Sequence, residues 1–257
     1  MTSFAKQYAR EWLEGLGRGA IMCRDIVSSL FHVKPAWRDL IYEMYFIGVK
    51  SQSVVMVTGA FTGMVLCAQT AFQFHKVKMD TATLAVVSVG MGSELGPVLT
   101  GLMVAGRVGA AIAAELGTMR VTEQVDALRT LAANPIDYLV VPRFLATLLV
   151  MPLLTAESVC IGILAAYIVA VYLLGINPTY LWYNMVHYTH INDMLTGMIK
   201  TFIFGGIVAV VACDKGLYCP QGAEGVGRAT TEAVVYSSIT ILISNFFLTL
   251  LLQKLLP

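Results

Sequence analysis

The sequence predicts an all-α membrane protein in which five long apolar helices cross the bilayer. Of its 257 residues, 57% are hydrophobic and only 13% are charged, whereas soluble domains carry about 25% charged residues. The apolar residues also gather in five long stretches, and each stretch contains one charged side chain or none. The net charge of +1 gives no electrostatic support for a nucleic-acid partner, so none is expected.

Each apolar stretch is long enough to span a membrane, which takes about 20 apolar residues of helix. The expected spans are residues 51–75, 81–106, 144–174, 194–213 and 233–253. Only three charged side chains lie within them, namely Glu94, Glu157 and Lys200. The whole chain, residues 1–257, is interpreted as one domain.

The distribution of basic residues predicts a cytoplasmic N-terminus, because cytoplasmic loops are enriched in Lys and Arg. In this orientation the inner segments hold twelve basic residues: Lys6, Arg10, Arg18, Arg24, Lys34, Arg38, Arg107, Arg120, Arg129, Arg143, Lys215 and Arg228. The outer segments hold only Lys76, Lys78 and Lys254. With five spans, the C-terminus is then expected on the outer side of the membrane.

The N-terminal region is expected to lie in the membrane interface rather than to cross the bilayer. Residues 1–38 combine frequent basic residues with Tyr8, Trp12 and Leu16, which are spaced four apart. Such spacing with basic flanks is typical of an amphipathic interfacial helix. The charges recur too often for the apolar core of a signal peptide.

The three intramembrane charges are the first candidates for function, because an ionised side chain at membrane depth is costly unless it is paired or hydrated. Each could also serve a purely structural pair, and Glu157 could pair with Lys200 if their depths match. Pro97 removes a backbone donor and crowds the Ser93 carbonyl, so the second span is expected to bend beside Glu94. A bend next to a carboxylate suggests a cavity.

Small residues in the first two spans leave two interpretations open. Gly59 and Gly63, and again Gly92 and Gly96, are spaced four apart. Such faces let helix backbones approach closely in a lipid environment. They could pack helices together within one subunit, or part of this face could build a homodimer.

No metal site and no catalytic residue is predicted. The five cysteines are scattered through mostly apolar stretches and are interpreted as buried thiols. Ser93 with His187 or His190 could suggest a protease dyad. However, Met91 breaks the Gly-x-Ser spacing, and both histidines lie in a loop expected on the outer side.

Residues 117–131 are predicted to form an amphipathic helix on the cytoplasmic side. Val121, Val125 and Leu128 recur at helical spacing and form one apolar stripe. Thr118 is interpreted as the N-cap of this helix. A helix of this kind could lie on the membrane or bind a cytoplasmic partner.

Two long motifs resemble the signature of the MlaE permease family. The first is ELGPVLTGLMVAGRVGAAIAAELGTMRVTEQVDAL, residues Glu94–Leu128, and the second is GAEGVGRATTEAVV, residues Gly222–Val235. The resemblance covers roughly residues 40–255. Members of this family are the membrane subunits of bacterial ABC systems that move phospholipid between the inner and outer membranes of Gram-negative cells and maintain the lipid asymmetry of the outer membrane.

The resemblance implies a multi-pass protein of the bacterial inner membrane that acts as a homodimer and encloses a lipid cavity. The chain contains no Gly-Lys pair and therefore no Walker-type nucleotide motif. The resemblance accordingly implies a separate ABC ATPase that binds ATP and Mg²⁺, with no cofactor in this chain itself. The other implied partners are a STAS-domain protein and a hexameric periplasmic ring of MCE-domain subunits.

The resemblance also implies the location of the functional residues. The lipid cavity and its gate are expected at Glu94, Gly96, Pro97, Leu66 and Thr70. The ATPase is expected to bind a coupling helix through Thr118, Met119, Arg120, Glu123, Gln124, Asp126 and Leu128. An ion-coupled secondary transporter that uses Glu94 and Glu157 is the alternative function, although the five spans show no obvious inverted repeat.

Overall fold

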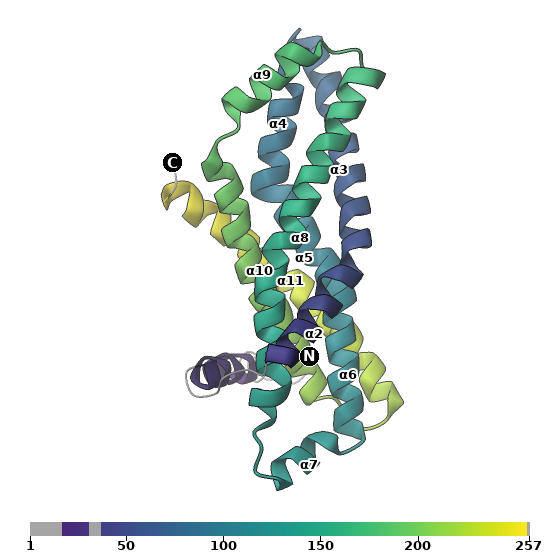
Figure 1. Ribbon diagram of the computed structural model, residues 1–257, viewed down its shortest axis with the longest axis vertical. Helices are drawn as coiled ribbons and strands as arrows, with labels where there is room; N and C mark the ends of the chain where they lie inside the picture. The colour runs from purple at the N-terminus through teal and green to yellow at the C-terminus, as the bar shows by residue number, and fades with distance from the viewer. Residues whose placement is uncertain (1–16, 31–36, 256–257) are drawn as a thin grey trace, which may run out of the picture.

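The computed structural model describes residues 17–30 and 37–255, and every regular element in these ranges is a helix (Figure 1). Within them, five helical stretches are long and apolar enough to cross a membrane: Trp37–Lys76, Asp80–Val121, Ile136–Leu173, Ile191–Leu217 and Ala223–Leu255. Each expected span falls on one of these stretches. The prediction of an all-α fold with five apolar spans is therefore confirmed.

Two of these stretches contain π-helical turns, in which one extra residue locally widens the helix. The second stretch consists of α4 (Thr83–Gly90), α5 (Gly96–Val104) and α6 (Ala110–Val121), joined by the π turns Met91–Leu95 and Ala105–Gly109. The third consists of α8 (Val141–Ile168) with the π turns Ile136–Val140 and Val169–Leu173 at its two ends. Such turns often occur at functional sites, and the first of them contains Glu94.

The remaining helices complete an elongated bundle. The other long elements are α2 (Trp37–Ile47), α3 (Val49–Lys76), α10 (Ile191–Leu217) and α11 (Ala223–Leu255). Helix α8 packs against both α3 and α10, and α10 also packs against α6 and α11. The short helices α9 (Pro178–Tyr188) and α7 (Gln124–Thr130) lie at opposite ends of the bundle (Figure 1).

The glycines of the first two spans pack helices together within the single chain. A Cβ atom at Gly63 of α3 would collide with the backbone of Gly162 in α8. A Cβ atom at Gly197 of α10 would likewise collide with the carbonyl oxygen of Gly92. These positions require glycine because the two backbones touch. Of the two interpretations of the small face, packing within one subunit therefore holds for these glycines.

The prediction of one continuous helix over residues 117–131 is wrong. Helix α6 continues through Thr118, whose hydroxyl donates to the Ala114 carbonyl oxygen at 2.8 Å instead of capping a helix start. The helix ends at Val121, and Glu123 adopts a left-handed conformation with φ of 60° before α7 begins. The spacing of apolar residues could not reveal this break, because two short helices in sequence can keep the same apolar stripe.

The interfacial helix expected over residues 1–38 is described only in part. Residues 17–30 form a helix, and its buried Met22 and Ile26 are spaced four apart, as in an amphipathic helix. Outside the described residues lie Tyr8, Trp12 and Leu16.

Helix α11 is the least buried of the five stretches. Only 11% of its most apolar segment is buried, against 28–50% in the other four. Its exposed side chains include Phe246, Phe247, Leu250 and Leu251.

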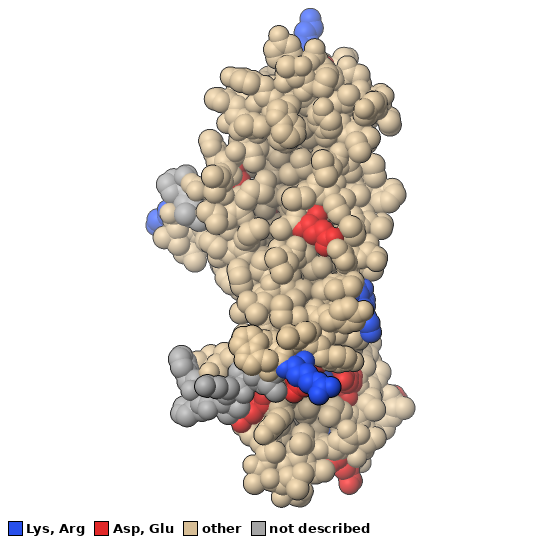
Figure 2. All heavy atoms as spheres, viewed as in Figure 1, with Lys and Arg blue, Asp and Glu red and all other residues tan. Residues whose placement is uncertain are grey.

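Figure 2 shows that charged side chains gather mainly towards the end of the molecule that carries α7, while the rest of this face is largely uncharged. An apolar surface of this extent fits a bilayer.

Candidate functional site

The π turn Met91–Leu95 surrounds the only charged residue of the expected second span. Pro97 follows two residues after the turn. Because proline has no backbone N–H, the Ser93 carbonyl loses the donor that a regular helix would supply. A π turn therefore lies beside Glu94, the bend expected there stays a prediction, and the Ser93 carbonyl oxygen is open to another donor.

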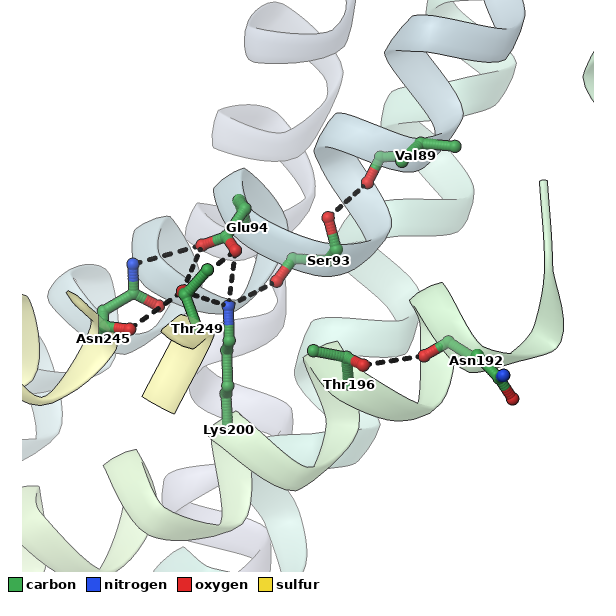
Figure 3. Close-up of polar contacts among 8 residues, drawn as sticks. All are labelled: Val89, Ser93, Glu94, Asn192, Thr196, Lys200, Asn245 and Thr249. Carbon is green, nitrogen blue, oxygen red and sulfur yellow. Dashed lines mark hydrogen bonds and ion pairs between the residues drawn. The ribbon is translucent and has the colours of Figure 1, made fainter. Parts of the chain in front are cut away.

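Lys200 of α10 supplies that donor. Its ammonium group donates to the Ser93 carbonyl oxygen at 3.0 Å, to Glu94 Oε1 at 2.7 Å and to Thr249 Oγ1 at 2.8 Å (Figure 3). A lysine ammonium has three N–H donors, so all three are engaged. The side chain is fully buried, and a buried lysine charge requires this kind of pairing.

Glu94 is the accessible partner of this ion pair. Its side chain is 34% exposed, whereas that of Lys200 is 0% exposed. Asn245 Nδ2 of α11 donates to Glu94 Oε2 at 3.2 Å, and Thr249 Oγ1 lies 3.0 Å from Oε1 and 3.2 Å from Oε2. We call Glu94, Lys200, Asn245 and Thr249 the Glu94 cluster. It joins the second, fourth and fifth stretches through one set of polar contacts.

The pairing of Glu157 with Lys200, which the sequence left open, is wrong. Lys200 pairs with Glu94, while the Glu157 carboxylate accepts a hydrogen bond from Gln52 Nε2 at 2.7 Å. That second contact joins α8 to α3. The two intramembrane carboxylates therefore belong to separate polar contacts, and only Glu94 is balanced by a buried cation.

The sequence interpretation missed Asn245 and Thr249. Both lie in the stretch 233–253, which contains no charged residue and therefore attracted no attention as a polar site. Their spacing of four residues places them on one face of α11, as the helical repeat requires. Polar residues at this spacing in an otherwise apolar span are a signal that sequence reading could have used.

Comparison with known proteins identifies the family. Residues 40–251 match the family model described as Permease MlaE. A probable ABC transporter permease protein of Rickettsia felis is 44% identical over 244 residues, which cover 95% of this chain and 94% of the relative. The chain belongs to the MlaE permease family. A probable ABC transporter permease protein of Synechocystis is 43% identical over 241 residues, covering 94% of this chain and 92% of the relative.

Membership in the MlaE family defines the class of this protein. It is the membrane permease subunit of an ABC transporter, it is a multi-pass membrane protein, and it is not itself an ATPase. An ABC permease implies a partner ATPase, and permeases of this family typically lack cofactors. A further relative is the Arabidopsis thaliana protein TRIGALACTOSYLDIACYLGLYCEROL 1, chloroplastic, with 36% identity over 228 residues that cover 89% of this chain and 65% of the relative.

The other residues expected in the cavity of the MlaE permease do not contact the Glu94 cluster through polar groups. Gly96 and Pro97 are buried at the start of α5, and a Cβ atom at Gly96 would collide with Val159 of α8. Leu66 and Thr70 are half-buried on α3, where Leu66 packs against a separate apolar cluster. Their role in a lipid cavity stays a prediction.

The residues expected to couple the MlaE permease to its ATPase lie at the α6–α7 junction. Arg120 of α6 pairs with Asp126 of α7 at 2.6 Å, and Asp126 also pairs with Arg129 at 3.2 Å. Of the other expected residues, Met119 and Leu128 are half-buried, whereas the exposed ones are Thr118, Glu123 and Gln124. The Arg120–Asp126 pair joins α7 to the end of α6 although the chain between them is not helical.

A second ionic contact connects α6 to α2 and α8 in the MlaE permease. The buried Arg143 of α8 lies 3.0 Å from Glu115 of α6 and 3.3 Å from Glu43 of α2, and it donates to the Leu139 carbonyl oxygen at 2.8 Å. One guanidinium group therefore connects α2, α6 and α8.

Proposed function

We propose that this MlaE permease moves phospholipid between the inner and outer membranes of a Gram-negative bacterium, and that the Glu94 cluster contacts the lipid headgroup. The observation that carries this proposal is a carboxylate within a membrane span that is 34% exposed and backed by a fully buried lysine. Ionisable groups at membrane depth usually mark a substrate or ion pathway. The Arabidopsis relative, which is named for a galactosylated diacylglycerol, supports a lipid substrate.

The cavity is proposed to form between two copies of the chain. Helix α11 contributes Asn245 and Thr249 to the Glu94 cluster and exposes large apolar side chains beside them, including Phe246 and Phe247. In a homodimer these side chains would line a space suited to acyl chains. Leu66 and Thr70 of α3 would contribute to the wall of the same cavity.

The permease is proposed to lie in the inner membrane with its N-terminus in the cytoplasm and its C-terminus in the periplasm. The α6–α7 junction would then face a cytoplasmic ABC ATPase, which binds ATP and Mg²⁺ and is accompanied by a STAS-domain protein. A hexameric ring of MCE-domain subunits would cover the periplasmic side. The excess of basic residues in the segments assigned to the cytoplasm supports this orientation.

Transmission from the ATPase is proposed to run along the second stretch. Helix α6 joins the coupling end to the π turn Ala105–Gly109, and α5 joins that turn to the π turn that contains Glu94. A displacement at the α6–α7 junction would therefore reach the headgroup contact through two widened turns.

The alternative, an ion-coupled transporter using Glu94 and Glu157, is weakened because these carboxylates have different partners in separate contacts.

Purification of the complex in mild detergent tests this proposal. The tagged chain is expected to retain an ABC ATPase and phospholipid, and the reconstituted complex is expected to transfer phospholipid only when ATP is supplied. Proton-dependent uptake by liposomes that contain this chain alone would instead support the ion-coupled alternative. Purification without an ATPase and without lipid would contradict the proposal.

A further inference from the structure

In the Glu94 cluster the carboxylate is partly exposed at the protein surface, whereas the lysine ammonium is buried. The Glu94 side chain is 34% exposed and the Lys200 side chain is 0% exposed. The lysine ammonium is already engaged by three acceptors, namely the Ser93 carbonyl oxygen, Glu94 Oε1 and Thr249 Oγ1 (Figure 3). A ligand that approaches the protein surface therefore reaches the Glu94 carboxylate first. It cannot accept a hydrogen bond from Lys200, because all three N–H donors of the ammonium are already engaged.

The Glu94 carboxylate still has capacity to accept a hydrogen bond. An ionised carboxylate offers about four lone-pair sites. Lys200 and Asn245 each occupy one. Thr249 has a single hydroxyl proton, which it divides between Glu94 and the Asn245 carbonyl oxygen at 2.9 Å. At least one acceptor position on this partly exposed carboxylate therefore remains for a donor outside the chain.

The chemistry of this position favours a positively charged donor. A charge-assisted N–H···O contact is roughly twice as strong as a neutral one, and it gains further in the low dielectric of a membrane site. A quaternary ammonium carries the same charge but has no N–H to donate. An anionic headgroup would face the carboxylate directly, and the buried Lys200 could reach it only by leaving its three acceptors.

We propose that the partly exposed carboxylate of Glu94 binds the protonated primary amine of an ethanolamine-type phospholipid headgroup, and that the permease discriminates against headgroup ammonium groups that carry no N–H. This inference rests on the proposed function, because it assigns a headgroup chemistry to the same site. The ammonium would occupy the free acceptor position of Glu94, and Lys200 would keep its contacts with the Ser93 carbonyl oxygen, Glu94 and Thr249.

A lipid series that differs only in N-methylation tests the inference. The full-length chain in detergent is offered an equimolar mixture of phosphatidylethanolamine, its N,N-dimethyl derivative, phosphatidylcholine and phosphatidylglycerol, all with identical acyl chains. The bound lipids are then quantified by mass spectrometry. One free acceptor position needs one N–H, so we expect the ethanolamine lipid and its N,N-dimethyl derivative to be retained about tenfold over the choline lipid, as one charge-assisted hydrogen bond supplies.

A double variant assigns the selectivity to the cluster. Glu94→Gln with Lys200→Met removes both charges together, so no unpaired charge is left buried, and we expect it to bind the four lipids without preference. The matched control is Glu157→Gln, which alters the other intramembrane carboxylate and should keep the enrichment of the lipids with an N–H over the choline lipid. The series in the unaltered chain decides the inference even if the double variant fails to fold.

Each outcome has a defined meaning. Equal retention of all four lipids, or enrichment of phosphatidylglycerol, would overturn the inference and leave the proposed function intact. Enrichment over the choline lipid that persists in the double variant would overturn the assignment to Glu94. Absence of any bound lipid would count against the proposed function, and the inference would fall with it.

Discussion

Lys200 illustrates how a membrane helix can contain a fully buried cation. Each of its three N–H donors has an acceptor, and one of these acceptors, the Ser93 carbonyl, is available because Pro97 cannot donate to it. Pro97 therefore leaves a carbonyl acceptor free for Lys200, and Lys200 in turn pairs with the Glu94 carboxylate. Sequence reading found all of these residues, but it could not pair them, because the pairing depends on the relative depth of helices that are distant in sequence.

The ion pair predicts a non-additive response to mutation. Glu94→Gln alone should destabilise the chain by about 3–5 kcal/mol, because it leaves the Lys200 ammonium buried without its partner. Lys200→Met alone should cost less, because Glu94 is 34% exposed and keeps Asn245 and Thr249 as partners. The double variant should lose much less than the sum. The midpoint of thermal unfolding in detergent measures this difference. Additive losses in the double variant would show that the two side chains do not act as a pair.

At the scale of helices, the glycine contacts determine which backbones touch. Gly63→Ala should destabilise the α3–α8 contact by about 1–3 kcal/mol, the usual range for overpacking, because its Cβ would collide with the Gly162 backbone. Gly106→Ala is the matched control, since nothing lies within 4 Å of a Cβ there. Thermal unfolding of both variants checks this. Equal midpoints would contradict the described packing.

At the α6–α7 junction, we expect one variant to weaken ATPase binding without changing the stability of the chain, and another to weaken both. No described residue pairs with the exposed Glu123 side chain, whereas Asp126 pairs with Arg120 and Arg129. Glu123→Lys should therefore reduce co-purification of the ATPase with little change in unfolding, and Asp126→Lys should reduce both. Surface ion pairs contribute about 0–1 kcal/mol each, so the loss of stability should be small. Normal co-purification in both variants would exclude this junction as the ATPase contact.

Hydropathy predicted the helices well but not their interruptions. The five apolar stretches follow from composition alone, because only a helix satisfies its own backbone donors and acceptors within lipid. The π turns do not follow from composition, since one extra residue per turn changes no hydropathy pattern. The break at Glu123 was missed because two short helices in sequence can keep the same apolar stripe. Asn245 and Thr249 were missed because attention was limited to charged residues.

For the whole molecule, the proposed homodimer predicts that the exposed face of α11 meets a second copy of the chain. The interpretation of all five cysteines as buried is wrong for Cys23 and Cys160, which are exposed. In a background with these two replaced by Ser, Phe246→Cys should form a disulfide between two copies if α11 lines the proposed dimer. Leu164→Cys on α8 is the control, because both native side chains are 61% exposed. Non-reducing electrophoresis of oxidised membranes reads the result. A dimer band for Leu164→Cys without one for Phe246→Cys would contradict the proposed dimer.

The central claim is that lipid meets the permease at the Glu94 cluster, and headgroup photo-crosslinking tests it most directly. A phosphatidylethanolamine with a photoreactive group next to its headgroup would be bound to the purified full-length chain and irradiated. Mass spectrometry of the peptides should locate the adducts at the π turn Met91–Leu95 and at residues 245–249. Adducts confined to α2 and α9, in a complex that still transfers lipid with ATP, would contradict the claim.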